Sequence, residues 1–382
     1  MALSKMRVLH LFSDWKWTGP AEPVVSLCET LNGQGLTVTL AYRKTPIEFP
    51  ERTVEKEVIK RNVPGFDGLR LNRYFSPRDW IFDLKKIRRF VDERGVDIVH
   101  THLSHDHATA AASLLFSKKR PLLVRTDHKR DGLPHSLPMA CLMARTDGLV
   151  TYSEKLRRQD TGYFKLPLER SCKIPPGLKP YRGPVQDIKE RLGLNDSDRV
   201  IGVIGRLKKD RGYDLILKAF RNVRDRMEHV KLIIVGRSSQ IQESIKKPLV
   251  ELGLEQDVIL AGYRIEDYFS VIAAFDIFVM MRAGSDGTAR ALREVLGMGK
   301  PAIVSTHGML PEMVIDGQTG YAVDLDEHEL ADRMERLLSD EKMRAQFGTK
   351  ARDYALTEWD YNKQAARLID FYKRLMDLGK RR

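Results

Sequence analysis

Short apolar runs alternate with longer amphipathic stretches along most of the chain. The runs that we expect to be strands cover residues 7–13, 36–41, 96–100, 122–125 and 148–151 in the first half, and 200–205, 230–236, 258–260, 275–280 and 302–305 in the second. Each run is short and mostly apolar, as in strands that are buried on both faces. Strands that alternate with helices in this way predict parallel sheets covered by helices on both sides.

The amphipathic stretches predict the helices between these strands. One covers residues 79–94, with Ile81, Leu84, Ile87 and Val91 on its expected buried stripe. Three helical stretches from about residue 327 to 378 close the chain. The last of them is amphipathic through Leu368, Phe371, Tyr372 and Leu375.

A break in this pattern predicts the domain boundary. Residues 175–186 contain four prolines and two glycines, a composition that interrupts both helix and strand. A chain of 382 residues is also too long for one ordinary core. We therefore expect a first domain over residues 1–178, a second over 179–360, and a final helix over 361–382 that packs back toward the first domain.

Composition indicates a cytosolic protein. Three widely spaced cysteines suggest neither a disulfide framework nor a zinc site. The first residues lack the long apolar run of a signal peptide, and no segment reaches the roughly 18 apolar residues that would span a bilayer. We expect a cytoplasmic protein, with peripheral contact on the inner face of the cytoplasmic membrane for the reason given next.

Positive charge is concentrated in the first half of the chain. Residues 1–180 contain 31 Lys+Arg against 20 Asp+Glu, a net charge of +11, whereas residues 181–382 contain 34 against 32, a net charge of +2. Clusters such as Lys85-Lys86 with Arg88-Arg89 would attract an anionic surface or substrate. Nucleic acid is not expected as a partner, because the clusters lack interleaved aromatic residues.

The stretch from Gly284 to Pro301 has the composition of a ligand-binding loop that leads into a helix. Small residues let the backbone approach a ligand closely, and Asp286 is a suitable N-cap residue for the helix. Glu294 lies about two turns further on. The free amide groups at the start of the helix form an anion site, which suits a phosphate.

This stretch resembles the Glu-x7-Glu motif of the retaining glycosyltransferases with the GT-B fold, family 4. The resemblance places Asp286 at the first Glu and Glu294 at the second. It implies that Asp286 acts at the donor sugar, that the amides of Gly287, Thr288 and Ala289 hold the diphosphate, and that Glu294 binds the ribose. Two departures are the shorter Asp286 and the charged Arg290 at a position that is usually apolar.

Residues 205–212, Gly-Arg-Leu-Lys-Lys-Asp-Arg-Gly, lie between a predicted strand and helix, where doubly wound folds bind phosphate. Two guanidinium groups in one loop suit a diphosphate. The loop resembles the family's Gly-Arg-x4-Lys-Gly, so Arg206 and Arg211 are implied on the donor diphosphate, with Arg211 in place of the usual Lys.

Weaker similarities extend the resemblance into both domains. The strand and loop that end at Gly262 and Tyr263 resemble the family segment that receives the nucleobase. The loop Trp17-Thr18-Gly19-Pro20-Ala21-Glu22 resembles the family's Gly-Gly-x-Glu loop, which implies that Thr18 and Gly19 border the phosphate and the acceptor.

His128 is the histidine expected to face the substrate. Arg125-Thr126-Asp127-His128 follows a predicted strand and resembles the family's Thr-x-His, whose imidazole lies at the sugar. For His100 and His102 we favour a structural role. A metal site would need a third ligand that the sequence does not identify, so no metal is expected.

The resemblance implies the fold class α/β, with two Rossmann-like, doubly wound parallel-sheet domains that face each other across a cleft. It implies a metal-independent retaining glycosyltransferase without a cofactor, whose co-substrate is a nucleotide-diphosphate sugar. The charge asymmetry favours an anionic or lipid-linked glycan acceptor, such as a lipopolysaccharide core, and contact with an anionic membrane.

Three other functions compete with this interpretation. A nucleotide-sugar 2-epimerase shares the fold but would need more acid and base groups. A non-catalytic nucleotide-sugar-binding protein is an alternative because Asp286 and Arg211 depart from the motifs. A dinucleotide dehydrogenase is disfavoured, because the loop after the first strand lacks Gly-x-Gly-x-x-Gly.

Overall fold

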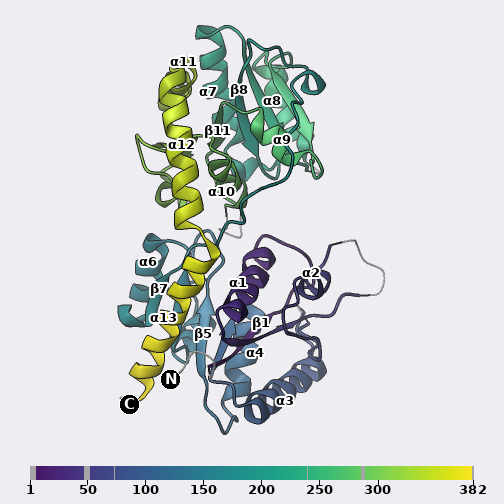
Figure 1. The fold of residues 1–382 in the computed structure, drawn as a ribbon, viewed down its shortest axis with the longest axis vertical. Helices are drawn as coiled ribbons and strands as arrows, with labels where there is room; N and C mark the ends of the chain where they lie inside the picture. The colour runs from purple at the N-terminus through teal and green to yellow at the C-terminus, as the bar shows by residue number, and fades with distance from the viewer. Residues whose placement is uncertain (1–5, 47–51, 73, 239, 285–288, 381–382) are drawn as a thin grey trace. The chain divides into compact units, whose positions relative to one another are not determined.

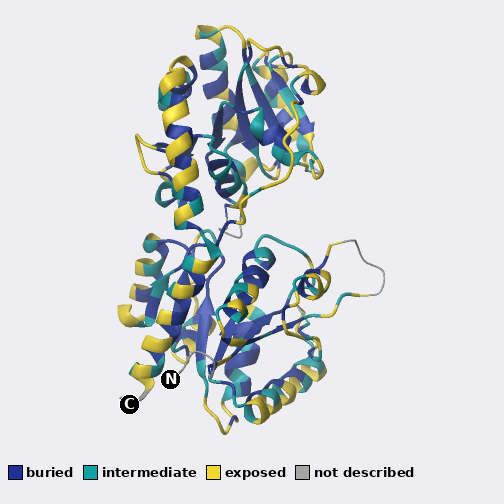
Figure 2. Ribbon diagram, in the orientation of Figure 1, coloured by how far each residue is buried: buried dark blue, intermediate teal, exposed yellow. Residues whose placement is uncertain are grey.

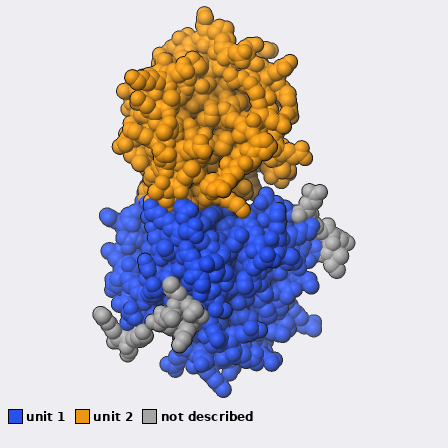
Figure 3. Space-filling model, viewed as in Figure 1, with its two compact units in different colours: residues 1–177, 360–382 blue, residues 178–359 orange. Residues whose placement is uncertain are grey.

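The computed structural model describes residues 6–46, 52–72, 74–238, 240–284 and 289–380. The chain forms two compact units (Figure 3). Unit 1 consists of Met1–Gly177 with Asp360–Arg382, and unit 2 consists of Leu178–Trp359. The key loop residues Ser285, Asp286, Gly287 and Thr288 lie outside the described residues.

Unit 1 contains, among its described residues, a seven-stranded sheet in the order β3-β2-β1-β4-β5-β6-β7 (Figure 1). All neighbouring strands are parallel. The strands are β1 Arg7–Phe12, β2 Thr37–Tyr42, β3 Gly65–Phe66, β4 Ile98–Thr101, β5 Leu122–Thr126, β6 Gly148–Thr151 and β7 Ser171–Lys173. The helices are α1 Ala21–Gly33, α2 Val54–Lys60, α3 Pro77–Arg94, α4 Ser104–Leu114, α5 Leu137–Met143, α6 Glu154–Phe164 and α13 Tyr361–Lys380.

Helices cover both faces of this sheet. Side chains of α1 and α13 form one hydrophobic cluster with strand residues such as Val8 and Val124. Side chains of α3 and α4 form a second cluster with Leu9 and Val99, the strand neighbours that point to the opposite face. The predicted stripe of α13, Leu368, Phe371, Tyr372 and Leu375, is confirmed as buried.

The predicted buried stripe of α3 is wrong at its first position. Ile81 is exposed, whereas Asp83 is buried together with Ile87 and Val91. The Asp83 carboxylate accepts the backbone N–H groups of Arg70 and Leu71, each at 2.8 Å. These bonds require Asp83 to face inward, which turns Ile81 toward solvent.

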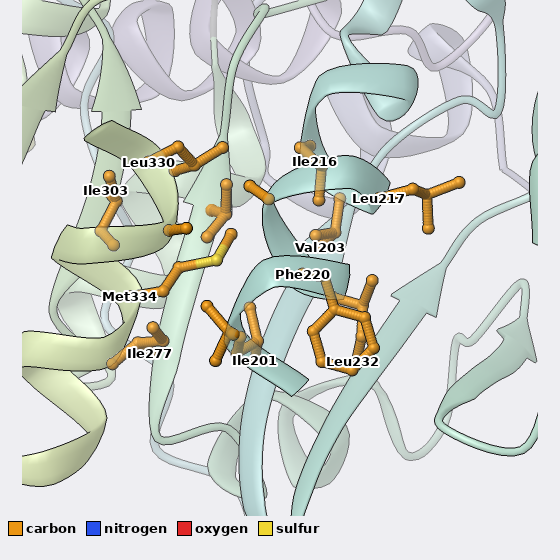
Figure 4. Close-up of a cluster of buried hydrophobic side chains, with 14 of the residues drawn as sticks. Ile201, Val203, Ile216, Leu217, Phe220, Leu232, Ile277, Ile303, Leu330 and Met334 are labelled. Carbon is orange, nitrogen blue, oxygen red and sulfur yellow. The ribbon is translucent and has the colours of Figure 1, made fainter. Parts of the chain in front are cut away.

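Unit 2 contains, among its described residues, a six-stranded parallel sheet in the order β10-β9-β8-β11-β12-β13. The strands are β8 Arg199–Ile204, β9 Val230–Val235, β10 Val258–Gly262, β11 Ile277–Met280, β12 Ala302–Ser305 and β13 Gly320–Val323. The helices are α7 Tyr213–Arg226, α8 Lys247–Glu251, α9 Tyr268–Ala273, α10 Arg290–Gly297, α11 Glu327–Ser339 and α12 Glu341–Glu358. Ile201 and Ile277 of the strands pack with Phe220 of α7 and Met334 of α11 in its core (Figure 4).

The two doubly wound parallel sheets confirm the predicted fold class. Figure 2 shows the strands of both sheets as mostly buried. The predicted strands are all present, with ends shifted by up to two residues. The short elements β3, β7, β13, α2, α4, α5 and α6 were not predicted. None of the described helices combines the length and the apolar character needed to cross a membrane.

An aspartate at the start of a strand recurs in both units. Asp97, before β4, accepts the backbone N–H of Arg7 at 2.8 Å, and Asp147, before β6, accepts that of Leu123 at 2.9 Å. In unit 2, Asp276 accepts the N–H of Val200 at 2.8 Å. Each carboxylate thus satisfies an N–H group near the start of the neighbouring strand.

We expect Asp97→Ala to lower the free energy of unfolding of unit 1 by about 1.5 kcal/mol, because it removes a hydrogen bond to a charged group. Asp97→Asn is the matched control and should lose less, since its amide oxygen still accepts. Urea unfolding followed by tryptophan fluorescence measures the change, because three of the four tryptophans lie in unit 1. Equal stability of the Ala variant and the unmodified protein would contradict the assignment.

Candidate functional site

The carboxyl ends of β8 and β11 form the point where the connections of unit 2 diverge. From β8 the chain continues to β9 and β10 on one side, and from β11 to β12 and β13 on the other. Ligands of doubly wound folds bind at such a point. The loop of residues 205–212 follows β8, and the segment that leads into α10 follows β11. The loop of residues 205–212 and the described start of the second predicted segment, Ala283 and Gly284, therefore leave the sheet at the same edge.

Arg211 joins these two segments directly. Its Nη1 donates a hydrogen bond to the carbonyl oxygen of Ala283, and its Nε lies 3.6 Å from Asp210 Oδ1. Gly212 has φ of 76°, and a Cβ at this position would lie 2.9 Å from Cβ of Met281. A glycine is therefore needed for the loop after β8 to lie against the segment after β11.

Arg206 occupies the exposed start of the same loop. Its side chain is exposed, whereas the Arg211 side chain is only 10% exposed. Among the described residues Arg206 makes no side-chain hydrogen bond or ion pair. The two arginines therefore differ: Arg211 is held in the loop structure and Arg206 extends into solvent.

Helix α10 begins later than predicted. The N-cap position belongs to Ala289, which has left-handed backbone angles (φ 42°) and makes no side-chain capping bond. The prediction that Asp286 caps the helix is therefore wrong. The predicted sites at Asp286, Gly287 and Thr288 lie outside the described residues, and Ala289 is buried directly before the helix. Leu292, Val295 and Leu296 face inward as predicted, and Ala291 is half-buried.

The Glu294 carboxylate is held by two donors. Tyr268 of α9 donates to Oε2 at 2.8 Å, and Arg290 Nε donates to Oε1 at 2.7 Å. The Glu294 side chain is 10% exposed. Burial and the neighbouring Glu294 charge hold the pKa of Tyr268 well above its usual value, so its hydroxyl stays a donor. Each carboxylate oxygen still has capacity for a further hydrogen bond.

Gly262 and Tyr263 lie at the end of β10, beside the end of β9. The Tyr263 ring is 58% exposed, and the Arg237 guanidinium lies 4.5 Å from its centroid. The N–H of Gly236 donates to Gly262 O at 2.9 Å. Arg237 was not predicted, and it adds a cation beside the aromatic face.

Thr18 and Gly19 form the turn before α1 in unit 1. Thr18 O accepts the N–H of Ala21 at 3.0 Å. Glu22, in the first turn of α1, accepts a hydrogen bond from the Tyr361 hydroxyl at 2.7 Å. The turn and the first residue of α13 are therefore connected through α1.

His128 lies two residues beyond β5 and is 4% exposed. Its Nδ1 is 2.5 Å from the Tyr152 hydroxyl, and its Nε2 is 3.0 Å from Nδ1 of His102. Burial lowers the pKa of His128 to about 3, with a further contribution from Arg125. Because of this low pKa the ring is neutral at neutral pH. It lines a small cavity of about 30 Å³ within unit 1.

A third histidine joins His100 and His102. His10 of β1 pairs in register with His100 of β4, and one ring nitrogen from each of the three lies within 4.8 Å of the others. The sequence-based argument that no third ligand is at hand is therefore wrong. These nitrogens already pair, however: His10 Nδ1 is 2.9 Å from His102 Nε2.

Arg125 is buried on the face of the unit 1 sheet opposite to His10 and His100. Its charge is balanced by Asp127 and Asp106, two buried carboxylates nearby. Burial raises the pKa of both carboxyl groups to about 6, although Arg125 acts in the opposite direction. Arg125 and Thr126, neighbours in the Arg125 to His128 motif, thus point to opposite faces of the sheet.

Several functional neighbours were missed for one physical reason. Tyr268, Arg237, His10, Tyr152 and Tyr372 contact the predicted residues across strands or helices, not along one segment. Of these five, only His10 has a signal in the sequence. Because side chains alternate between the two faces along a strand, His10 and His100 point to the same face of the adjacent strands β1 and β4.

Two family models match this chain. Residues 18–182 match the model described as glycosyltransferase family 4, and residues 184–354 match the model described as glycosyl transferases group 1. Together they cover most of the chain.

Curated relatives point the same way. The chain is 30% identical over 210 residues to a GDP-mannose-dependent alpha-(1-6)-phosphatidylinositol monomannoside mannosyltransferase of Mycolicibacterium smegmatis, covering 52% of this chain and 54% of that protein. It is 26% identical over 209 residues to the lipopolysaccharide 1,2-N-acetylglucosaminetransferase of Salmonella typhimurium, covering 51% and 54%. The chain thus spans about half the length of these two relatives.

A solved structure agrees in fold. The Anabaena protein Alr3699/HepE, crystallised with UDP, superposes with a TM-score of 0.77 at 18% identity, over 96% of this chain and 100% of that one. On the family matches and this fold, the chain belongs to the glycosyltransferases of the GT-B fold, with a family 4 domain followed by a group 1 domain.

Proposed function

We propose that this protein is a retaining glycosyltransferase that moves a sugar from a nucleotide-diphosphate sugar to an acceptor. Unit 2 would bind the donor and unit 1 the acceptor. The observation that carries the proposal is the hydrogen bond from Arg211 to Ala283. It holds a cationic loop against the segment before α10, at the divergence point of the unit 2 sheet.

The reaction would require stabilisation of a leaving nucleoside diphosphate. Arg206 and Arg211 would supply positive charge, and the family resemblance implies that the amides of Gly287, Thr288 and Ala289 would supply donors. With this charge in place we propose that no metal ion is needed. The acceptor oxygen would attack from the face that the leaving phosphate vacates, and that phosphate would accept the proton, so no separate protein base is assigned.

The remaining donor contacts follow from the family resemblance and the local geometry. Glu294, already oriented by Tyr268 and Arg290, would accept hydrogen bonds from the ribose hydroxyls. The backbone near Gly262 and Tyr263 would receive the nucleobase. Asp286 and His128 would act at the sugar, and Thr18 and Gly19 would border the phosphate and the acceptor.

The acceptor would be an anionic or lipid-linked glycan. The M. smegmatis and S. typhimurium relatives are named for a phosphatidylinositol mannoside and for lipopolysaccharide. The first half of this chain also carries the larger net positive charge.

Helix α3 supports a membrane-facing role for unit 1. Phe75, directly before α3, is 73% exposed, and Phe116, which follows α4, is 65% exposed. The segment after α4 is tied to α3, because Asp92 accepts hydrogen bonds from Ser117 Oγ at 2.8 Å and Lys118 N at 3.0 Å. Exposed apolar groups thus lie near both ends of a helix that carries basic residues.

We therefore propose a cytoplasmic protein that binds peripherally to the inner face of the cytoplasmic membrane. Arg88 and Arg89 pair with acidic residues one turn away, Asp92 and Glu93. Lys85 and Lys86 are exposed on the same helix and would provide the contacts to anionic lipid headgroups.

The activity is tested by incubating the protein with UDP-, GDP- and ADP-sugars in EDTA, with extracts of lipid-linked glycans as acceptors. We expect release of one nucleoside diphosphate and transfer with the anomeric configuration retained, read by NMR. Inversion, strict dependence on added metal, or epimerisation without transfer would contradict the proposal.

We expect Glu294→Gln to raise the Kd of the nucleotide about tenfold or more, because it weakens charged hydrogen bonds. Asp286→Asn should mainly lower turnover at saturating donor. Arg290→Ala is the control, since it removes the ion pair but keeps the carboxylate. If both acidic variants lost only nucleotide affinity, the role of Asp286 would be wrong.

Lys85→Ala/Lys86→Ala should weaken binding to anionic vesicles by about 2 kcal/mol, or about 30-fold, since each basic residue contributes about 1 kcal/mol. Co-sedimentation at low and high salt measures this. Lys246→Ala/Lys247→Ala, an exposed pair in unit 2, is the matched control. Equal binding to anionic and zwitterionic vesicles would argue against the membrane proposal, and so would full activity on a soluble neutral sugar without binding to either.

A further inference from the structure

Glu57 is a buried carboxylate on the apolar side of helix α2. The buried residues of this helix are Val54, Glu57 and Val58, and both valines belong to a hydrophobic core cluster of unit 1. Glu57 is 7% exposed. It occupies a position of the buried stripe where an apolar side chain is usual. Burial of a carboxylate costs free energy unless its charge is paired, so this position requires cations nearby.

Two arginines, one at each end of α2, bind the two oxygens of this carboxylate. Arg52, which precedes the helix, donates from Nε to Oε1 at 3.0 Å, and Arg61, which follows it, donates from Nε to Oε2 at 3.1 Å. The Arg61 side chain is 12% exposed, whereas the Arg52 side chain is 55% exposed. The charge of Glu57 is therefore paired with one largely buried and one exposed guanidinium group.

Both guanidinium groups also lie against the ring of Trp17. The central carbon of Arg52 is 5.2 Å from the centroid of the ring, and that of Arg61 is 5.3 Å from it. The Trp17 side chain packs against the same core cluster as the buried face of α2. A cation at this distance is attracted to an aromatic ring. Glu57 therefore holds two cations beside one indole ring.

Backbone contacts attach the same loop to α2. Lys16 and Thr53 form an isolated antiparallel bridge, and the N–H of Val54 donates to the carbonyl oxygen of Trp15 at 3.0 Å. Thr53 is the N-cap of α2, so these contacts and the two arginines belong to one short stretch of chain. The loop after β1 is thus attached to α2 through both backbone and side chains.

The Thr18-Gly19 turn begins directly after Trp17. The N–H of Thr18 donates to the carbonyl oxygen of Lys16 at 2.9 Å, and the carbonyl oxygen of Thr18 accepts the N–H of Ala21 at 3.0 Å. Because Trp17 and Thr18 are neighbours in the chain, a displacement of Trp17 would disturb both bonds.

Arg61 also reaches helix α1, which lies beside α2 (Figure 1). Its Nη1 donates to Oγ of Ser26 at 2.6 Å and lies 3.6 Å from Oε2 of Glu29. Arg61 thus contacts α1, the carboxylate on α2 and the ring of Trp17 at the same time. The two helices and the loop after β1 share this one guanidinium group.

We propose that Glu57 is a positioning residue for the Thr18-Gly19 turn. It acts through Arg52 and Arg61, which hold Trp17, and hence the turn, against α2. That the turn borders the acceptor rests on the proposed function. The hold on the turn does not, because it follows from contacts within unit 1 alone.

A carboxylate suits this role because both of its oxygens accept hydrogen bonds. A guanidinium group offers only donors. The amide introduced by Glu57→Gln has one acceptor oxygen and one NH₂ group, and that NH₂ group would face a guanidinium group donor to donor. The variant should therefore release one arginine. We expect it to be Arg52, whose side chain is the more exposed.

Hydrogen exchange of the full-length protein, read by mass spectrometry, tests the hold on the turn. Glu57→Gln should speed exchange of the Thr18 and Ala21 N–H groups by about tenfold or more, the factor for one charged hydrogen bond. Glu29→Gln is the matched control. It removes another carboxylate beside Arg61 but leaves Glu57 in place, so it should change neither rate.

Arg52→Gln provides a second variant that disturbs no buried charge on its own side chain. It removes the exposed cation beside Trp17 and should speed exchange of the same two N–H groups by about threefold, the factor for one exposed cation–π contact.

Kinetics with the acceptor identified by the transfer assay test what the turn does. The KM for that acceptor should rise about tenfold in Glu57→Gln. The Kd of the released nucleoside diphosphate should change by less than about twofold, because the charged groups proposed to bind it, Arg206, Arg211 and Glu294, belong to unit 2. A merely structural role would lower stability without this split.

Unchanged exchange of the turn in both Glu57→Gln and Arg52→Gln would overturn the proposal, and so would equal acceleration in Glu29→Gln. Equally faster exchange in the remote strand β5 would also overturn it, because this would indicate a general loss of stability. Faster exchange of the turn with an unchanged KM would overturn its role toward the acceptor. If no sugar nucleotide supports transfer, the proposed function fails, whereas the exchange rates still decide whether Glu57 holds the turn.

Discussion

The hydrogen bond from Arg211 to the Ala283 carbonyl is the contact on which the unit 2 site depends. It joins two loops that belong to different halves of the sheet, which diverge after β8 and β11. The bond is possible because Gly212 lets the loop after β8 approach Met281. Without it, the loop that carries Arg206 would lose its link to Ala283, which precedes α10.

The central strands of the two sheets, together with the loop after β8, carry different polar groups. In unit 2, the loop that follows β8 carries the guanidinium groups of Arg206 and Arg211. In unit 1, the corresponding strands β1 and β4 carry His10 and His100, which burial keeps neutral. The loop of unit 2 is therefore positively charged, whereas the buried histidines of unit 1 are neutral hydrogen-bonding groups.

The sequence predicts the repeating architecture well, because buried parallel strands have a strong apolar signal. It predicts Arg211 and Glu294 as residues near one site because each lies in a compact local motif. It does not predict the Tyr268 contact to Glu294 or the His10 contact to His102, since these depend on packing between distant segments. Ile81 was misplaced because backbone hydrogen bonds to Asp83 outweigh the apolar pattern.

The most direct test of the account is calorimetric binding of a nucleoside diphosphate and of its monophosphate. We expect the diphosphate to bind more tightly, and we expect Arg206→Ala and Arg211→Ala each to reduce that preference by about tenfold or more, the loss of one charged hydrogen bond. Lys209→Ala, at an exposed cation of the same loop, should reduce it less. An unchanged preference in both arginine variants would contradict the account.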